Sequence, residues 1–458
     1  MIRWMRLAAA AALLGALACA GSAVAGPPGK WTQVTGVGGQ EDLNTLRVGL
    51  VRTADGVLHV GWSRAGAANS ASILHSSVSA DAKTVAGPDT VFTYTGGANE
   101  SVALVRAPEG MRAFFAGLEA GSALDRAMAT ATSANGQAWS AASPASFAGS
   151  GASPVYVAAG LDANAAVDGT FFSAWGDSAP GGGGFHVGLD SGAADGELPA
   201  GLKSDPGIGV DSQSGQVFLA WNDLDADSVA VMALSPLGSP VTLPNSGAAQ
   251  LQHRVGITGR IGAPGVFIAY TQGTNPFLAD PAVFRVDTGK ATKLTKKDGE
   301  QMGIAAAPAG RLWVFWKDGG TVFAERSNKA ATKFGATRSI RAPGGSATSI
   351  FNLAGEGSRG PLDLLALADP SSGPLANYHQ RILPGLTLKA SHKKNGKTAF
   401  KVTDAGAPVA GAKVKVKGDG SKKTGKSGTV TFSLSEGRHS AKATKNGYAP
   451  ATARARGK

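Results

Sequence analysis

Apolar residues along this chain fall into short runs that recur in pairs, with a turn glycine between the two runs and usually a Trp at the end of the second. The returning run alternates as strands do: in residues 217–221 the Val, Leu and Trp point to one side, and the Phe and Ala to the other. Both sides are apolar, which predicts sheets that neighbouring sheets cover on both faces. The clearest copies are Gly56–Trp62, Gly169–Trp175, Gly215–Trp221 and Gly310–Trp316, and weaker copies begin at Gly110, Gly265 and Gly360.

The turn glycines recur at a regular distance. Successive ones are 54, 59, 46, 50, 45 and 50 residues apart. A period of about 50 residues that is built from strands is typical of a β-propeller. The first repeat divides into four expected strands near residues 46–52, 57–62, 72–78 and 90–94. We therefore predict an all-β chain whose main domain, residues 26–385, is a six- to seven-bladed β-propeller.

The segment before the first repeat is expected to close the ring. Residues 30–34 read as one short strand. A ring of sheets leaves a free edge where its two ends meet, unless a strand from one end pairs with the other. The sequence therefore predicts that residues 30–34 pair with the last blade near Tyr378–Leu383.

The first 25 residues have the features of an export signal. Arg3 and Arg6 precede an apolar run that is too short to span a bilayer, and Ala23-Val24-Ala25 is a small-residue cleavage site. We expect a secreted or cell-surface protein of bacterial type. Cys19 is the only cysteine and lies inside the signal, so lipidation at Cys19 stays an open alternative to cleavage before Gly26. In the cleaved form disulfides would have no part.

The basic character of the chain lies in its last 72 residues. Residues 387–458 carry 17 Lys and Arg against three acidic residues, a net charge of +14 in a chain whose total is +12. Composition shifts to Lys, Thr and Val after Gly385. We predict a second domain, residues 386–458. The motifs 402–416, 428–432 and Gly447-Tyr448 resemble the small Ig-like or carboxypeptidase-regulatory-like β-sandwich of secreted bacterial proteins.

Lysines alternate with valines in residues 413–417, which predicts lysines on one face of a strand and valines on the other. Such a face is either a solvated surface that discourages edge pairing or a surface that adheres to an anionic envelope polymer. Tyr448 is the only aromatic residue among these charges beyond the expected core, so nucleic acid is not an expected partner.

The turns between the expected third and fourth strands resemble a degenerate Asp-box. They read 79–84, 133–139 and 286–289, and the copy that ends at Trp139 carries Asn135 where the motif has Asp. The chain therefore resembles the sialidase-type, BNR-like β-propellers over residues 30–385. That resemblance implies a propeller whose turns are held by an acidic side chain with an aromatic residue packed beneath.

A polar residue stands two places after the aromatic residue in five of the repeats. Side chains at these points begin the turn between the second and third strands, at the rim where propellers usually bind ligands. A rim of this kind suits a sugar or a cation, whereas aspartate in a turn also caps nearby backbone N–H groups. The candidate ligand-binding residues are Arg64, Asp177, Asp223, Gln272 and Asp318.

A sialidase-type glycoside hydrolase is the alternative that the resemblance implies. Such an enzyme uses three arginines, a Tyr–Glu nucleophile pair and an acid Asp. Arg47 lacks the following proline of the family motif. The remaining candidates are Arg254, Arg260 and Arg311 for the arginines and Tyr270 and Tyr378 for the nucleophile. We identify no catalytic residue among these positions.

The other chemistry-bearing residues do not form a pattern. His59 and His75 are expected to be strand residues, and no spacing predicts a metal site or a cofactor. The sequence favours a monomeric, non-catalytic propeller that recognises a glycan or a cell-surface partner, with no transmembrane segment. A purely structural envelope protein is the third alternative.

Overall fold

The structure is a computed structural model that describes residues 23–24, 29–35, 48–65, 70–95, 101–118, 126–144, 157–177, 185–189, 203–247, 255–273, 279–294, 298–371, 373–393 and 395–457. Within these ranges the regular elements are strands, together with one short 3-10 turn, η1 (Val286–Thr288). The expectation of an all-β fold is confirmed. No helix in the described parts is long and apolar enough to cross a membrane.

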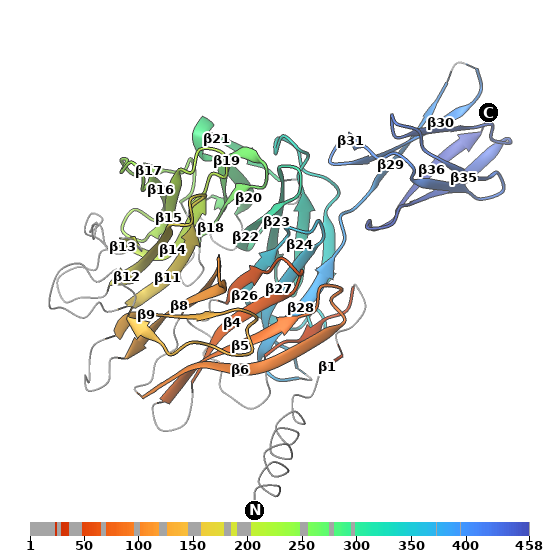
Figure 1. Cartoon of the computed structure of the whole chain (residues 1–458). Coiled ribbons are helices and arrows are strands. Elements are labelled where there is room, and N and C mark those ends of the chain that lie inside the picture. Colours follow the sequence, from red (N-terminus) through yellow and green to blue (C-terminus); the bar gives the residue numbers. More distant parts are fainter. Residues whose placement is uncertain are drawn as a thin grey trace, which may run out of the picture.

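The residues before position 385 form small antiparallel sheets whose strands follow one another in sequence (Figure 1). The first sheet contains β3 (Gly49–Arg52), β4 (Leu58–Ala65), β5 (Ser70–Val78) and β6 (Thr84–Thr95), with β1 (Ala23–Val24) on its outer edge. The second contains β7 (Val102–Ala107), β8 (Gly110–Leu118), β9 (Arg126–Ser133) and β10 (Ser143–Pro144). The third contains β11 (Val157–Ala165), β12 (Phe171–Asp177) and β13 (Phe185–Leu189).

Four further sheets follow the same order. The fourth contains β14 (Lys203–Val210), β15 (Val217–Asp223), β16 (Ser228–Ala233) and β17 (Val241–Thr242). The fifth contains β18 (Gly256–Arg260), β19 (Ala263–Gln272), β20 (Asp280–Arg285) and β21 (Lys290–Lys293). The sixth contains β22 (Glu300–Ala307), β23 (Arg311–Asp318), β24 (Thr321–Arg326) and β25 (Arg338–Arg341). The seventh contains β26 (Ser349–Glu356), β27 (Leu362–Asp369), β28 (Ala376–Ile382) and β2 (Thr32–Gln33).

The first strands of these sheets contact one another in a cycle. In the described residues β3 contacts β7, and the contacts continue through β11, β14, β18, β22 and β26 back to β3. Small residues permit this close approach. A Cβ atom on Gly49 would lie 2.6 Å from the backbone nitrogen of Leu104, and one on Gly207 would lie 2.3 Å from the carbonyl oxygen of Val255. The inner strands therefore surround a common axis.

The recurrent Trp residues lie between adjacent sheets, as predicted. Trp62, Trp175, Trp221 and Trp316 are each no more than 1% exposed. Trp221 packs in one cluster with Phe172 of the preceding sheet. These side chains form the core between sheets, which explains why the second strand of these repeats carries a large aromatic residue near its end.

The N-terminal segment pairs with the last sheet, as predicted. Thr32 pairs with His379 and Gln33 with Tyr378, so β2 is the outer strand of the seventh sheet. The same segment also reaches the first sheet, because Val34 lies in one apolar cluster with Trp62. Its backbone thus belongs to the last sheet, while Val34 packs against the first sheet and Trp31 against the sixth and seventh.

Turn side chains hold the connections between the third and fourth strands. In the turn that ends at Trp139, Ser133 Oγ accepts a hydrogen bond from Gly136 N at 2.8 Å, and Asn135 Oδ1 accepts one from Gln137 N at 3.0 Å. Trp139 Nε1 donates to the carbonyl oxygen of Gly136 at 3.0 Å. These contacts explain the residue types of the turn, and its assignment as an Asp-box remains a proposal.

Residues after position 385 form two antiparallel sheets around an apolar core of their own (Figure 1). One sheet contains β29 (Thr387–His392), β30 (Thr398–Asp404), β31 (Ala407–Pro408) and β34 (Thr429–Phe432). The other contains β33 (Gly420–Lys423), β32 (Lys413–Val416), β35 (Gly437–Thr444) and β36 (Ala451–Gly457). In β32 the lysines are exposed and the valines buried, which confirms the predicted alternation.

Ion pairs and backbone bridges join this C-terminal module to the sixth sheet. Asp404 is 2% exposed and accepts a hydrogen bond from Arg326 Nη2 at 2.5 Å, with Arg311 Nη1 at 3.4 Å. Gly385 forms isolated bridges with both Ala336 and Ala449. The two parts thus touch through a buried charge as well as through the connecting chain. The boundary at residue 385 remains a proposal.

Candidate functional site

A cavity of about 190 Å³ lies on the axis that the inner strands surround. Each of the seven inner strands lines it, so the cavity belongs to the ring as a whole. Every inner strand is an edge of its own sheet and pairs on one side only. The unpaired side of an edge strand presents backbone N–H and C=O groups. The wall of the cavity therefore offers hydrogen-bond donors and acceptors from several directions.

Three polar side chains stand among the residues that line the axial cavity. They are Asp162 and Asn164 on β11 and Asn352 on β26. Asp162 is 7% exposed, and its Oδ2 accepts a hydrogen bond from Ile208 N at 2.8 Å. Asn164 Nδ2 donates to the carbonyl oxygen of Ile208 at 3.1 Å. These bonds fix both side chains against β14, and Asp162 is the one ionisable residue of the lining.

The five predicted rim residues lie at the ends of second strands, outside the lining of the axial cavity. Register places two of them where inner strands begin: Asp177 pairs with Val157, and Asp223 with Lys203. The side chain of Asp177 lies outside the described residues. Arg64, Gln272 and Asp318 end β4, β19 and β23 or stand one residue before the end. The five are therefore at equivalent positions of successive sheets, and their role in binding stays a prediction.

Two of the rim residues also hold local structure. Asp223 Oδ1 accepts a hydrogen bond from Ala226 N at 3.1 Å, which is the turn-capping role of aspartate. Gln272 Nε2 donates to the hydroxyl of Tyr270 at 2.7 Å and to the carbonyl oxygen of Pro244 at 3.1 Å. A ligand at either residue would share the side chain with these bonds.

The described residues of the sialidase alternative serve structural contacts. Arg260 donates to the carbonyl oxygens of Gly310 at 2.7 Å and Pro264 at 2.9 Å, and also to that of Lys329. Arg311 donates to the carbonyl oxygen of Ser327 at 2.7 Å. Neither arginine lines the axial cavity. Arg47 and Arg254 lie outside the described residues.

The two tyrosines of that alternative are likewise bonded to nearby backbone. Tyr270 is buried, which raises its pKa to about 12, and its hydroxyl donates to the carbonyl oxygen of Pro244 at 3.0 Å. Tyr378 donates to the carbonyl oxygen of Pro374 at 2.8 Å. A high pKa opposes formation of a tyrosinate nucleophile at Tyr270. The hydrogen bonds of these two tyrosines and of Arg260 and Arg311 thus serve local structure.

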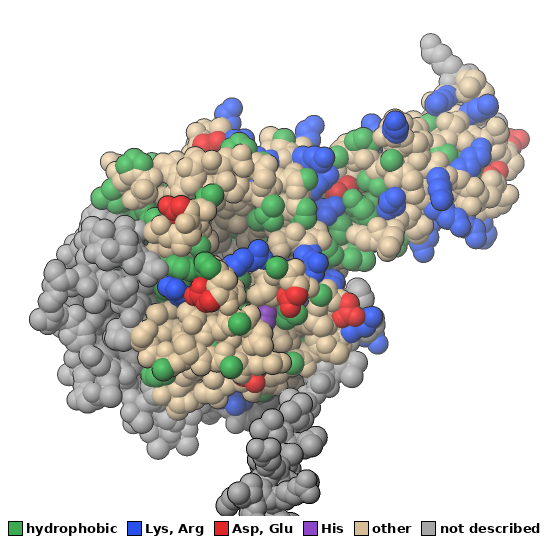
Figure 2. Space-filling view, in the orientation of Figure 1, with side chains coloured by type: hydrophobic (Ala, Val, Ile, Leu, Met, Phe, Trp, Pro, Cys, Tyr) green, Lys and Arg blue, Asp and Glu red, His purple; other side chains and the backbone are tan. Residues whose placement is uncertain are grey.

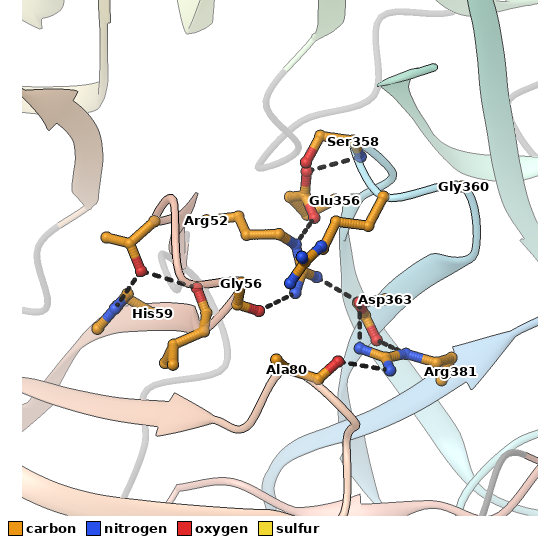
Figure 3. Close-up of polar contacts among 12 residues, drawn as sticks. Arg52, Gly56, His59, Ala80, Glu356, Ser358, Gly360, Asp363 and Arg381 are labelled. Carbon is orange, nitrogen blue, oxygen red and sulfur yellow. Dashed lines mark hydrogen bonds and ion pairs between the residues drawn. The ribbon is translucent and has the colours of Figure 1, made fainter.

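The structure brings together a polar cluster that the sequence did not predict, between the first and seventh sheets (Figure 3). We call Arg52, Glu356, Asp363, His379 and Arg381 the closure cluster. Its centre is Asp363, which is 2% exposed. Oδ1 of this residue lies 2.9 Å from His379 Nε2 and 2.8 Å from Arg381 Nε, while Oδ2 pairs with Arg52. Arg52 also pairs with Glu356.

The charges of the closure cluster are neutralised inside the protein. Burial alone would raise the pKa of Asp363, but hydrogen bonds from His379 and Arg381 and the charge of Arg52 hold it well below its usual value. The carboxylate is therefore ionised in the folded protein at neutral pH. The ion pairs of Arg52 with Asp363 and Glu356 therefore join the first sheet to the seventh.

A buried histidine pair lies in the first sheet, close to the turn that Arg52 helps to hold. His59 Nδ1 is 2.9 Å from His75 Nε2, and Thr53 Oγ1 is 3.0 Å from His59 Nε2. Both residues lie on strands, as expected, and His75 contacts the edge of Trp139. Burial lowers the pKa of each to about 4, and repulsion between the two adds to this for His59. Among the described residues, no cluster of His, Cys, Asp or Glu suited to a metal ion is present.

This pair predicts a loss of stability in mild acid. A depressed pKa means that the folded protein binds fewer protons than the unfolded chain, so the histidines contribute full stability above pH 6.5 and lose it as the pH falls toward 4. We expect the pair to account for a loss of several kcal/mol, because one pKa unit corresponds to about 1.4 kcal/mol and both pKa values are lowered from 6.5 to about 4. Thermal melting from pH 7 to pH 4 measures it. The variant His59→Gln/His75→Gln should show a flatter profile over that window, and an equally steep profile would contradict the assignment.

Comparison with known proteins does not assign a family. No family model matches the chain, and no curated protein matches it. Among solved structures, the chain is similar to the Hadza microbial sialidase Hz136 (12% identity, TM-score 0.42) over 65% of this chain and 66% of the sialidase. It is also similar to the Aleuria aurantia lectin AAL (11% identity, TM-score 0.44) over 66% of this chain and 96% of the lectin.

A puromycin hydrolase is matched at the same level, with 12% identity and a TM-score of 0.42 over 82% of this chain and 62% of the hydrolase. The chain thus spans about two thirds of the sialidase and somewhat less of the hydrolase. The matched proteins include glycan-binding and glycan-processing proteins as well as this hydrolase. At such low identities and TM-scores these likenesses support no conclusion about the activity or the ligand of this chain.

Proposed function

We propose that this protein is a secreted, non-catalytic β-propeller of seven blades that recognises a glycan at the end of its ring where the inner strands begin. Its basic C-terminal module would associate with the cell envelope. The observation that carries the proposal is the axial cavity, whose wall combines unpaired strand edges from seven sheets with Asp162, Asn164 and Asn352. Hydroxyl groups of a sugar both donate and accept hydrogen bonds, and this wall offers partners for both.

The size of the cavity limits the part of a glycan that it can hold. Its volume of about 190 Å³ is below the roughly 300–1,000 Å³ of sites that enclose a drug-sized ligand. We therefore propose that the cavity receives a terminal sugar residue. The remaining residues of the glycan would lie across the rim, where Arg64, Asp223 and Asp318 are placed.

The proposal predicts binding of the chain beginning at Gly26 to a subset of oligosaccharides on a glycan array. The variant Arg64→Ala/Asp223→Ala/Asp318→Ala should bind at least about tenfold more weakly, because hydrogen bonds to charged groups contribute about 1.5–3 kcal/mol each. The charge-matched control is Glu109→Ala/Asp168→Ala/Lys329→Ala. These three exposed residues lie in turns at the opposite end of the ring.

The outcomes separate the alternatives. Binding that the rim variant loses and the control variant keeps supports the proposal. Absence of binding to every glycan contradicts recognition and favours a purely structural envelope protein. Release of fluorophore from a fluorogenic sialoside would replace the proposal with the sialidase alternative. Binding that both variants retain would show that the binding site does not include this rim.

A further inference from the structure

Eight cationic side chains cover one face of the C-terminal module. They point outward from the sheet of β33, β32, β35 and β36, since the alternate residues of β32 and β35 are buried in the core. Figure 2 shows lysine and arginine side chains gathered over this part of the molecule. We call this surface the basic face. Its cations, all exposed, are Lys413, Lys415, Lys417, Lys423, Arg438, Lys442, Arg454 and Arg456.

The register of the sheet places like charges directly opposite each other. Lys413 pairs with Lys423, Lys415 with Lys442, and Arg438 with Arg456. Like charges in directly opposed positions destabilise an antiparallel sheet. The outer face of a sheet needs only polar side chains, and threonine is polar, suits strands and would avoid the repulsion between opposed cations. The basic face therefore carries a cost in the free protein that a bound polyanion would remove.

The acidic residues of the module do not neutralise the basic face. Asp404 is buried at the junction, where it pairs with Arg326 and Arg311. Asp419 lies 2.7 Å from His439 Nδ1, and that histidine side chain is 8% exposed. Glu436 lies outside the strands, in the segment before β35. The charge of the face thus remains available to a partner.

Small hydroxyl residues stand between the cations. Ser440 pairs with Arg454, Thr452 with Lys442, and Ser421 with Lys415. Same-face residues repeat every 6–7 Å along a strand and about 4.8 Å between strands. Aromatic side chains, on which nucleobases stack, are missing from the outward positions of the described strands, as are large apolar side chains that would enter a bilayer. Cations alternating with hydroxyls on a flat surface match a flexible polysaccharide that bears anionic groups at regular intervals.

We propose that the basic face binds a linear, carboxylate-bearing polysaccharide. This deepens the proposed envelope association, on which it rests, by naming the surface and the chemistry of the partner. Each carboxylate would sit between two opposed cations and relieve their repulsion. The terminal sugar residue proposed for the ring is a separate ligand, so the two sites are testable independently.

The test measures binding of the chain beginning at Gly26 to fluorescent polygalacturonate by anisotropy, between about 50 and 200 mM NaCl. The basic-face variant is Lys413→Thr/Lys415→Thr/Lys442→Thr/Arg454→Thr. The matched control, Lys389→Thr/Lys393→Thr/Lys397→Thr/Lys401→Thr, removes the same charge from the other sheet and its hairpin, where these lysines are also exposed.

We expect the slope of log affinity against log salt to fall by about three in the basic-face variant and by no more than about one in the control. We also expect the melting temperature of the basic-face variant to be unchanged or higher, because it removes the repulsion in the pairs Lys413–Lys423 and Lys415–Lys442. If the face is only solvated, the melting temperature would be unchanged or higher, but the slope would not fall. If the slope falls equally in the two variants, the proposal is contradicted, because binding would then depend on net charge and not on the basic face.

Further outcomes would overturn the assigned partner. One is the absence of binding to polygalacturonate at the lowest salt concentration. The other is that the chain binds a single-stranded oligonucleotide or phosphatidylglycerol vesicles more tightly than polygalacturonate, and that the basic-face variant loses this binding. Dextran serves as the neutral polymer and should not bind. If polygalacturonate does not bind but the glycan array shows binding, the proposal for the ring is kept and the proposal for the basic face is rejected. If polygalacturonate binds but no glycan on the array does, the proposal for the basic face is kept and the proposal for the ring is rejected.

Discussion

Replacing Asp363 with alanine is expected to lower the free energy of unfolding by about 3 kcal/mol or more, the range seen when one partner of a buried ion pair is removed. Asp363 is the shared acceptor of Arg52, His379 and Arg381 in the closure cluster. Its loss leaves Arg381 and His379 buried without this partner, whereas Arg52 keeps Glu356. Urea denaturation at pH 7, followed by the fluorescence of the buried Trp residues, measures the change.

The same strand offers a matched control. Asp369 ends β27, six residues after Asp363, and its side chain is exposed. Asp369→Ala should change stability by less than about 0.5 kcal/mol, as surface substitutions usually do. If Asp363→Ala is no more destabilising than Asp369→Ala, the closure cluster does not hold the first and seventh sheets together. The pKa of Asp363 lies below its usual value, so the wild-type advantage should persist at neutral pH and fade only in strong acid.

Removal of residues 26–36 is expected to lower the melting temperature by about 10 °C or more. The deletion removes the strand pairs Thr32–His379 and Gln33–Tyr378 and exposes the edge of β28. It also removes the buried Val34 and the hydrogen bond from Trp31 Nε1 to the carbonyl oxygen of Arg341 at 2.7 Å. Burial of each such apolar side chain contributes about 1.5–3 kcal/mol. Differential scanning calorimetry of chains that start at Val37 and at Gly26 gives the comparison.

A point variant tests whether the effect comes from pairing rather than from chain length. Lys30 is exposed beside the same strand, so Lys30→Ala should melt like the unaltered protein. Unchanged melting of the shortened chain would mean that the ring does not depend on this closure. An uncovered edge also favours aggregation, so loss of stability without aggregation would indicate that another segment covers the edge of β28.

Several features could be predicted because they depend on local pattern. The Gly-to-Trp repeats predicted the second strands and the burial of their Trp residues, since a strand places alternate residues on opposite faces. The need to pair the free edge of the last sheet predicted that residues 30–34 pair with it. Alternation of Lys and Val predicted which side of β32 faces the core.

The candidate sites depended on distant residues and were harder to predict. Arg52 and Asp363 are 311 positions apart, and nothing near either residue indicates the other. Asp162 and Asn164 read as ordinary strand residues until β11 is placed against β14, where both bond to Ile208. Conversely, the residues that the repeats singled out lie one strand outside the axial cavity.

The sequence by itself determined the strands, their repeat and the core Trp positions, because each follows from periods of two and of about fifty residues. Only the tertiary structure decided which inner strands meet around the cavity, which charges meet at the closure cluster, and that cations oppose one another across the basic face. The physical reason is that strand register and sheet order bring residues together across hundreds of positions, and the local pattern of apolar residues is the same whichever partner a strand finds.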